Sequence, residues 1–517
     1  MKKKSIIQPF NFLIFAPLIF YFGKRSYLAY DEGFYALQAR WMLEKNNWII
    51  PSWFNEYNLN IDRTIAIQYL IGKSQQFFGS SSFAAHIPTT VFAILMLFMT
   101  FKLHEELIDK KGAIFSTLIL STTYIWLNFA HLATQDMIFA CLITTGIYSL
   151  IKIENSSNKF YQLIFGAWIG LAFMMKTFLV AVPLISLGPY ILMKNKTISK
   201  KLFCIGFLVG FIPFIFWALL INQYIDRNII FHLLDKFNHL SNTNNFTNPF
   251  YYYLWNIPIN FFPWSIFAFI GLFFNWKNKD SNTFILVYFP IILVIILSIF
   301  STKTPYYPLQ IASILSINAY TGIKEIFQSK KLEFKFKLIV GKILPIFILS
   351  SIAIFYLIYR EPINLNLKEE ISLITGLIIF SVSWSFLSKE LNSKQKFVSL
   401  IIGPYLLSSL IVQSGLLTDR SRGIRESMEY IITRENLKDQ LINVKTSDIN
   451  NEKSYSKIIR ISIMTPNLGE GVKNLREINS SDYIWATDSK NLNDNAEEFK
   501  VIYSDENLYP WKLLIRK

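Results

Sequence analysis

Apolar runs fill most of residues 1–414, and short polar segments separate them. Each run has about 16 to 22 residues, which is long enough to cross roughly 30 Å of hydrocarbon as a helix. The pattern predicts an α-helical polytopic membrane protein with about 13 transmembrane helices. One continuous apolar stretch is divided at Lys176 to give two of these helices. The predicted spans are 8–23, 83–103, 112–131, 134–152, 160–176, 177–194, 202–221, 256–275, 282–300, 306–326, 337–358, 370–388 and 396–414.

Two of the polar segments are too long to be simple connections. Residues 24–82 form a first long loop and residues 222–255 a second. The first loop contains two helical patterns, "DEGFYALQARWMLEK" and "DRTIAIQYLIGKSQQFFG". On a helical wheel of the first pattern, Asp31 and Tyr35 share one face and Arg40 lies nearly opposite. Both helices are amphipathic, so we expect them to rest on the outer membrane surface and to cover a cavity.

The chain is predicted to have two domains, a transmembrane domain over 1–414 and a small soluble α/β domain over 415–517. The stretch "SRGIRESMEYIITREN" is typical of an amphipathic helix. Three later runs are rich in β-branched and aromatic residues and are interpreted as strands. These runs are "KIIRISIM", "DYIWAT" and "FKVIYS".

Composition supports the membrane class, because 52% of the residues are hydrophobic and 16% are aromatic. The net charge is +16, but residues 415–517 carry 16 Lys and Arg against 16 Asp and Glu. The positive excess therefore belongs to the membrane domain, where it marks cytoplasmic connections rather than a nucleic-acid site. Those connections include "HEELIDKKG", "KNKTISKK", "NWKNKD", "KEIFQSKKLEFKFK" and "SKELNSKQK".

This charge pattern orients the protein with its N-terminus in the cytoplasm and its C-terminal domain outside. The basic start "MKKKSIIQPFNFLIFAPLIFYFG" lacks a small-residue cleavage site, so we interpret it as a retained first span. Cys141 and Cys204 both lie within apolar runs, which argues against a disulfide framework or a cysteine metal site. We expect a multi-pass protein of a bacterial plasma membrane, with the C-terminal domain in the periplasm.

Charged residues that adjoin apolar segments gather on the predicted outer side. Asp31 and Glu32 taken alone fit a helix N-terminus, where carboxylates are favoured by the helix dipole. Each of the other charges alone fits a solvated or snorkelling side chain. Together, carboxylates and cations at one interface suit an anionic lipid headgroup and a hydroxyl that must lose its proton. The other members of this set are Asp62, Arg63, Asp136, Lys236 and Lys303.

The order of several motifs resembles the GT-C class of lipid-linked-sugar glycosyltransferases, in particular bacterial aminoarabinose transferases and, more distantly, protein O-mannosyltransferases. The resemblance covers roughly residues 1–320 and also extends to the overall architecture. It is carried by "DEGFYALQARWMLEKNNWIIPSW", "IDRTIAIQYLIGKSQQFFGSSSFAAHIPT", "GLAFMMKTFLVAVP", "NPFYYYLWNIPINFFPW" and "STKTPYYPL".

The resemblance implies an inverting transfer of a sugar from a polyprenyl phosphate donor to a hydroxyl or phosphate of an acceptor. Asp31 matches the family's general base, and Asp136 falls near a second family acid. The partners implied are the polyprenyl-phosphate-linked sugar, membrane lipids and an acceptor lipid, glycan or protein. The implied donor-phosphate residues are Arg63, Lys303 and Lys236, and the implied substrate-pocket residues are Glu32, Tyr35, Asp62 and Tyr307.

Three departures from the family pattern concern the donor sugar. Phe34 stands where the family commonly has a basic residue, and Thr64 replaces a common proline. The "YYPLQ" stretch also lacks the family's proline one place later. These changes argue against assuming aminoarabinose as the donor sugar, and the acceptor stays open.

The resemblance names no certain cofactor. A divalent metal is possible, because His232 and Asp62 are rough counterparts of a family zinc site. A loop histidine without a paired ligand pattern is more often solvated. His86 and His104 are interpreted as structural residues.

Three other functions are compatible with a polytopic chain. A transporter or flippase would place charges near the bilayer midplane and show repeated halves, and neither feature is found. An oligosaccharyltransferase would carry a WWDYG-like signature in its outside domain, and "DYIWATD" does not match it. A non-catalytic membrane scaffold would not need Asp31 and the surrounding cations.

Overall fold

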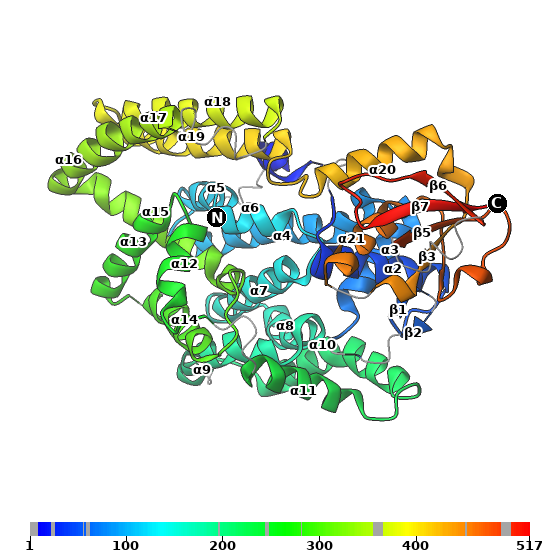
Figure 1. The fold of residues 1–517 in the computed structure, drawn as a ribbon. Helices are drawn as coiled ribbons and strands as arrows, with labels where there is room; N and C mark the ends of the chain where they lie inside the picture. Colours follow the sequence, from blue (N-terminus) through cyan, green and yellow to red (C-terminus); the bar gives the residue numbers. More distant parts are fainter. Residues whose placement is uncertain are drawn as a thin grey trace.

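The computed structural model is dominated by helices, with a small mixed α/β unit at the C-terminal end (Figure 1). The residues that it describes are 9–21, 26–54, 56–57, 61, 63–194, 197–242, 248–280, 282–354, 365–449, 452–487 and 498–517.

Seven helical runs among the described residues are long and apolar enough to cross a membrane. They are α4 (Ser82–Leu107), α7 (Gln135–Asn155), α8 with α9 (Phe160–Lys176 and Ala181–Met193), α10 (Lys200–Ile221), α16 with α17 (Lys330–Leu338 and Leu344–Ile354), α18 (Leu367–Ser385) and α19 (Ser393–Ser414). Two bent pairs raise the number to nine if each is one span. They are α5 (Ala113–Ser121) with α6 (Tyr124–Ala130), and α12 (Tyr252–Asn260) with α13 (Ser265–Asn278).

The predicted number of 13 spans is not confirmed in the described part of the chain, and bends and mergers explain much of the difference. The pair α5–α6 bends by 68° and the pair α12–α13 by 113°, although hydropathy treats each as one segment. The two spans predicted on either side of Lys176 form one helical run, Phe160–Met193, interrupted at Thr177 by a positive φ of 48°. Apart from the helices of the first long loop and of the C-terminal unit, the remaining α-helices among the described residues are α1 (Ala16–Ile19), α11 (Ile229–Asn242), α14 (Phe289–Ile299) and α15 (Ala312–Gln328).

Helices α8 and α10 pack with their backbones in close contact, because each carries two glycines four residues apart. A Cβ atom on Gly166 would lie 2.2 Å from the carbonyl oxygen of Phe203, and one on Gly206 would lie 2.2 Å from that of Leu163. Small residues at this spacing let membrane helices approach closely. The contact fixes the position of α8, which ends at Lys176 beside the candidate site.

The first long loop folds against the ends of these helices. A π-helical turn, Ala29–Gly33, leads into α2 (Phe34–Glu44), which is followed by the short strands β1 (Ser52–Trp53) and β2 (Glu56–Tyr57) and by α3 (Ala66–Phe78). The Gln68 amide donates to the side-chain oxygen of Gln38 at 3.0 Å, which ties α3 to α2. Residues 35–42 of α2 are all buried, because the C-terminal unit covers the side that α3 leaves open.

The C-terminal unit has a five-stranded sheet in the order β4-β3-β5-β7-β6. Strand β3 runs parallel to β4 and β5, and β7 runs antiparallel to β5 and β6. Helix α20 and strands β5 and β6 confirm three of the sequence predictions for this region. Its helices and strands are α20 (Arg422–Arg434), α21 (Glu452–Met464), β3 (Ile442–Lys445), β4 (Leu468–Val472), β5 (Tyr483–Thr487), β6 (Phe499–Tyr503) and β7 (Trp511–Arg516).

The prediction of a strand at "KIIRISIM" is wrong, because these residues form the second half of α21. The isoleucines favour a strand by local propensity, but tertiary packing decides this case. Ile458, Ile459 and Ile461 are all 0% exposed. The polar residues Lys453, Lys457 and Arg460 lie on one face of α21 at helical spacing, so the helical period appears only when the segment before "KIIRISIM" is included.

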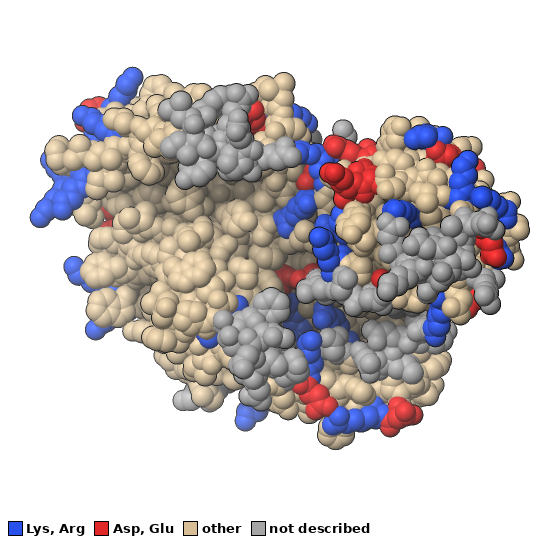
Figure 2. Space-filling model, viewed as in Figure 1, with Lys and Arg blue, Asp and Glu red and all other residues tan. Residues whose placement is uncertain are grey.

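Charged side chains are sparse over the broad apolar surface of the helical part and gather over the C-terminal unit (Figure 2). Large apolar residues of α10 such as Leu208, Phe216 and Leu219 are exposed, as expected where lipid replaces water. The predicted fold class is confirmed: the chain is a multi-pass α-helical membrane protein with a small C-terminal α/β unit.

Candidate functional site

Asp31 lies on the π-helical turn Ala29–Gly33, and its side chain is exposed. Among the described residues, no hydrogen bond or ion pair ends on its carboxylate. π-Helical turns are rare and are found frequently at functional sites. The turn therefore presents an unpaired carboxylate at the point where the first long loop enters α2.

Glu32, the next residue, points into the protein and is 1% exposed. Its carboxylate is paired with the Nε2 atom of His86 and accepts hydrogen bonds from the backbone N–H groups of Ala133 at 3.0 Å and Leu28 at 3.1 Å. Burial opposes the ionisation of Glu32, but the charge and the hydrogen bond of His86 hold its pKa below the ordinary value. The structure thus turns Glu32 away from the open side of the turn and toward α4.

Arg63 and Tyr35 form a second part of the site. The Arg63 guanidinium donates to the Tyr35 hydroxyl at 2.6 Å and lies 5.6 Å from the centre of its ring. Burial raises the pKa of the Tyr35 phenol, so the hydroxyl keeps its proton. Next to Arg63, the Thr64 hydroxyl donates to the carbonyl of Met174 at 2.5 Å. This bond holds the start of the α3 region against the end of α8.

Asp136 and Lys176 form the third part, and their side chains are paired in an ion pair. Asp136 stands in the first turn of α7, and Lys176 is the last residue of α8. The Lys176 ammonium lies 4.5 Å from the ring centre of Tyr306 and 5.7 Å from that of Tyr307. Two tyrosines and a carboxylate therefore surround one ammonium group with little access to bulk water.

The charges of these groups act on one another across the site. Although Asp31 is exposed on one side, the surrounding protein displaces part of the water around its carboxyl group, and this loss and the negative charge of Asp136 raise the pKa of Asp31 above the ordinary aspartate value. The charges of Arg63 and Lys176 act in the opposite direction. A carboxylate with a raised pKa is a stronger base than a free aspartate. The structure thus brings together Asp31, Arg63, Tyr35, Asp136 and, through Lys176, Tyr307.

Lys303 and Lys236 come from other segments of the chain. Lys303 is 5% exposed, and within the described residues its ammonium donates to the carbonyl of Phe300 at 2.6 Å. Burial lowers the pKa of Lys303. Lys236 is partly exposed on α11, a helix that contacts the turn Thr177–Val180 directly after Lys176. The described contacts do not connect Lys303 to the cluster around Asp31.

The metal hypothesis gains no support from the described residues. Among them, no group of three or more His, Cys, Asp and Glu side chains is arranged to hold a metal ion. His232 is partly buried on α11, and Asp62 lies outside the described residues. The pairing of His232 with Asp62 stays a prediction.

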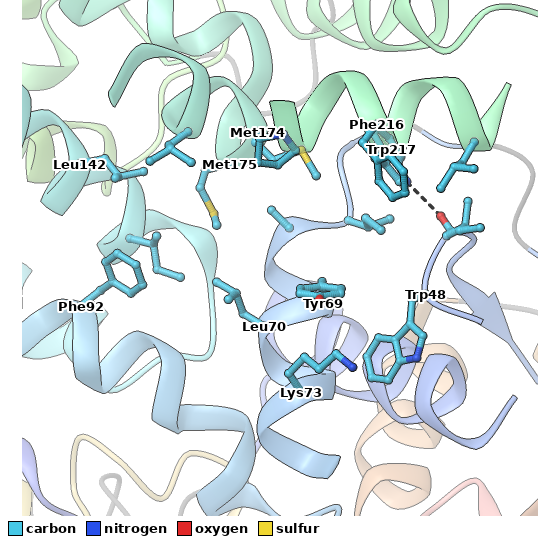
Figure 3. Close-up of a pocket in the computed structure, with 17 residues that line it drawn as sticks. Trp48, Tyr69, Leu70, Lys73, Phe92, Leu142, Met174, Met175, Phe216 and Trp217 are labelled. Carbon is cyan, nitrogen blue, oxygen red and sulfur yellow. Dashed lines mark hydrogen bonds between the residues drawn. The ribbon is translucent and has the colours of Figure 1, made fainter. Parts of the chain in front are cut away.

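An apolar cavity of about 610 Å³ opens beside the cluster, between α3, α4, α7, α8 and α10 (Figure 3). Met174 and Met175 line it, and both directly precede Lys176. Ile65 and Ala66 line it as well, two and three residues after Arg63. At one end in the view of Figure 3, the Lys73 ammonium lies 3.9 Å from the ring centre of Trp48. Residues that line the cavity are thus close neighbours, in the sequence, of both cations that act on Asp31.

Sequence reasoning did not single out Lys176 or Tyr306. From the sequence, Lys176 is interpreted as the boundary between two spans and as one of the few positive charges of the outside connections, although a cation inside a long apolar stretch is itself a signal of function. Tyr306 directly precedes Tyr307 in the motif "STKTPYYPL" and could have been included with it. His86 was interpreted as structural, and its pairing with Glu32 depends on the packing of α4 beside the turn, which no local pattern reveals.

Comparison with known proteins places this architecture in context. The model of the dolichyl-phosphate-mannose-protein mannosyltransferase family matches residues 62–218. The undecaprenyl phosphate-alpha-4-amino-4-deoxy-L-arabinose arabinosyl transferase of Edwardsiella ictaluri is 26% identical over 301 residues, which are 56% of this chain and 54% of that protein. The enzyme of the same name from Yersinia pestis is 25% identical over 307 residues, 56% of this chain and 53% of that protein. The chain thus spans about half the length of the curated relatives it matches.

Solved structures extend the likeness to nearly the whole chain. ArnT from Cupriavidus metallidurans, bound to undecaprenyl phosphate, matches with a TM-score of 0.74 at 14% identity and covers 98% of this chain and 97% of ArnT. The apo oligosaccharyltransferase of Archaeoglobus fulgidus matches with a TM-score of 0.50 at 10% identity, over 92% of this chain and 69% of that one. The fold is similar to those of ArnT and the archaeal oligosaccharyltransferase, and the family and sequence matches confirm the resemblance to lipid-linked-sugar glycosyltransferases predicted from the motifs. Within this class, the similarity is to the aminoarabinose transferases in both sequence and fold.

Proposed function

We propose that this protein transfers a sugar from a polyprenyl phosphate donor to a hydroxyl or phosphate of a lipid, glycan or protein acceptor. The transfer takes place on the outer face of a bacterial plasma membrane and inverts the anomeric carbon. The observation that carries the proposal is the Asp31 carboxylate, which has no partner among the described residues and on which the charges of Arg63 and Lys176 act, beside an apolar cavity. An acceptor hydroxyl needs a base, and a leaving phosphate needs positive charge nearby.

Asp31 is the proposed general base, and the two aspartates of the site have different tasks. Asp136 is engaged by Lys176 in an ion pair, whereas Asp31 is exposed and has no partner among the described residues. Asp31 takes the proton of the acceptor hydroxyl as its oxygen attacks the anomeric carbon from the face opposite the phosphate. The bond between that carbon and the phosphate oxygen breaks, and the polyprenyl phosphate leaves with the electron pair.

Arg63 and Lys176 are the proposed contacts of the donor phosphate. Arg63 is fixed by Tyr35, and a guanidinium group can hold two phosphate oxygens at once. Lys176 is held by Asp136 and the tyrosine pair, so its position does not depend on the substrate. Lys303 and Lys236 remain proposed donor contacts on the basis of the motif alignment, while Tyr307 and Glu32 contribute to the walls of the pocket.

The apolar cavity suits the isoprenoid chain of the donor. Its wall consists of Leu142, Leu171, Met174, Phe92 and similar side chains, and two of its lining residues, Ile65 and Met175, lie within two residues of Arg63 and Lys176 in the sequence. A chain that enters from the lipid would place its phosphate beside Arg63 and Lys176. This arrangement agrees with the architecture shared with ArnT, which was solved with undecaprenyl phosphate bound.

The test is mass spectrometry of lipids that co-purify in mild detergent with the wild-type protein and with the Asp31→Asn variant, both expressed in the source organism. We expect a polyprenyl phosphate or its glycosylated form to be bound and to be enriched in the variant, which binds the donor without turning it over. The mass of the headgroup then identifies the sugar. If neither preparation retains a polyprenyl species after incubation with added undecaprenyl phosphate, the donor assignment is wrong and transport becomes the better hypothesis.

A further inference from the structure

The turn that carries Asp31 is in direct contact with the C-terminal unit. A Cβ atom on Gly33 would lie 2.7 Å from the Cγ2 atom of Ile459 and 2.5 Å from the carbonyl oxygen of Leu28. Only a glycine leaves room at this position for the Cγ2 methyl group. Helix α21 therefore packs on the turn two residues after the proposed base.

The segment just before the turn, residues 26–28, is also held by the C-terminal unit. The backbone N–H of Ser421 donates to the Ser26 hydroxyl, and the Ser421 hydroxyl donates to the carbonyl of Tyr27 at 3.1 Å. Arg460 of α21 donates in turn to the Ser421 hydroxyl at 3.1 Å. The approach to the turn is thereby connected to α21 through the segment that joins α19 to α20.

Helix α2, which follows the turn, is fixed at the end of α21. The Arg40 side chain is 4% exposed and donates to the carbonyls of Thr465 at 2.7 Å and Pro466 at 2.9 Å, as well as to Glu44 at 2.8 Å. These carbonyls follow the C-terminus of α21, where a positive charge is favoured by the helix dipole. A buried guanidinium group with three partners makes a rigid connection between the two helices.

The opposite side of the turn is fixed by Glu32. The His86 Nδ1 atom donates to the carbonyl of Ser82 at 2.6 Å, and its Nε2 atom is hydrogen-bonded to the Glu32 carboxylate. Since Glu32 also accepts from Ala133, the turn is connected to α4 and to the start of α7. Described contacts thus hold the turn from the membrane side through Glu32 and from the other side through α21.

We propose that helix α21 of the C-terminal unit is a positioning element of the active site, which holds the Asp31 turn against α4 so that the carboxylate keeps its reactive place. The C-terminal unit is then part of the catalytic framework rather than a separate module for acceptor binding. This inference rests on the proposed function, because it assigns Asp31 the role of base. It deepens that proposal by giving a task to residues 415–517.

Three substitutions of Ile459 and its neighbour separate positioning from general stability. Ile459→Val keeps the Cγ2 methyl that contacts the turn, whereas Ile459→Leu has the same number of atoms and lacks it. Ile458→Leu is the matched control, because Ile458 is also 0% exposed but belongs to the main hydrophobic core. Transfer is measured as release of polyprenyl phosphate from the lipid-linked sugar pool of the source organism, in the presence of its envelope lipids.

We expect Ile459→Leu to lower kcat at least fivefold while KM for the donor and the binding of undecaprenyl phosphate stay within twofold. Ile459→Val and Ile458→Leu are expected to keep kcat within twofold of wild type, although Ile458→Leu lowers Tm. Equal losses of kcat in Ile459→Leu and Ile458→Leu, or unchanged kcat in Ile459→Leu, would overturn the positioning role. Arg40→Lys, which keeps the charge but loses the forked contact, gives an independent variant with the same expected split.

Hydrogen exchange tests the positioning without any substrate. We expect amides of residues 28–36 to exchange faster in Ile459→Leu than in wild type, and no such change in Ile458→Leu. If this exchange difference is found but the wild type transfers no sugar, the proposed function fails and the contact is structural. If the wild type transfers sugar and residues 28–36 exchange alike in both variants, the positioning role fails and the proposed function stands.

Discussion

The two sides of the Asp31 turn differ in how their polar groups are satisfied. On the buried side, the Glu32 carboxylate has His86 and two backbone N–H groups as partners. On the open side, the Asp31 carboxylate has none among the described residues, although it is the adjacent residue. Buried polar groups in proteins are almost always hydrogen-bonded, so Glu32 follows the general rule for a structural carboxylate. The contrast shows that, within one turn, one carboxylate can stabilise the fold while its neighbour stays available for chemistry.

Removal of the open carboxylate is expected to have the largest effect on transfer. In Asp31→Asn, the side chain keeps its shape but cannot take a proton, and loss of a general base typically lowers the rate by about 10²- to 10⁴-fold. We expect kcat to fall by this amount while Tm and the binding of undecaprenyl phosphate stay near the wild-type values. Asp136→Asn serves as the comparison, because it removes a carboxylate that is already paired with Lys176. If both variants lost activity only in proportion to lost folded protein, Asp31 would not be the base.

Removal of the buried carboxylate should affect folding more than chemistry. Glu32→Gln breaks a buried pair, and such losses destabilise proteins by about 3 kcal/mol. We expect a clearly lower Tm in a thermal unfolding experiment. The folded-state pKa of Glu32 is lowered, so its stabilising contribution is present at neutral pH and disappears as the pH falls through the folded-state value. The stability of the variant should therefore fall less steeply than that of the wild type as the pH is lowered. An unchanged Tm in the variant would contradict the structural role of Glu32.

The contrast between the two acids could be anticipated only in part from the sequence. The motif and the charges of the connections placed Asp31, Arg63 and Asp136 at one end of the helices, because such information is carried by contiguous residues. The partner of Glu32 could not be deduced, since His86 lies 54 positions away and reaches it through the packing of α4. Lys176 was hidden in an apolar run for the same reason: its partners belong to α7 and to the loop before α15.

Helix α21 shows the opposite limit. Its isoleucines predict a strand locally, whereas in the structure Ile459 contacts the Asp31 turn and Ile458 the core from the buried side of an amphipathic helix. The number of spans also depended on tertiary structure, because a 113° bend between α12 and α13 leaves hydropathy unchanged. Fold class and motif order can thus be predicted from the sequence, whereas helix bends and pairs of residues far apart in the chain cannot.

Lys176 offers a way to sharpen the comparison through the pH dependence of transfer. Asp31 must be ionised to act as a base, so the rate falls as the pH drops through its pKa, which is raised above the ordinary aspartate value by loss of water and by Asp136. Lys176→Met removes a cation that lowers the pKa of Asp31. The substitution also leaves the negative charge of Asp136 without its Lys176 partner, and this charge raises the pKa of Asp31. We expect the acidic limb of the kcat profile to move to higher pH. Undecaprenyl phosphate should bind about tenfold more weakly, equivalent to about 1.4 kcal/mol.

Lys303→Met is the control for this experiment, because its ammonium donates to the Phe300 carbonyl and lies outside the described cluster around Asp31. It should leave the acidic limb of the profile in place even if donor binding weakens. An acidic limb that moved equally in both variants would show that the shift comes from the net charge of the protein rather than from contact with the Asp31 cluster.

The smallest expected effect concerns the apolar cavity. Leu142→Trp places a larger side chain in the cavity wall, on α7 six residues after Asp136, without changing any charged group of the site. We expect undecaprenyl phosphate to bind a few-fold more weakly, with kcat unaltered at saturating donor, because a ligand pocket that loses volume holds less of the chain. The matched control is Leu208→Trp on the exposed apolar surface of α10, which should bind the lipid like wild type. Equal binding by all three proteins, measured by native mass spectrometry with undecaprenyl phosphate, would place the isoprenoid chain elsewhere. In that case the cation cluster could still bind the donor phosphate, but the cavity beside it would not hold the isoprenoid chain.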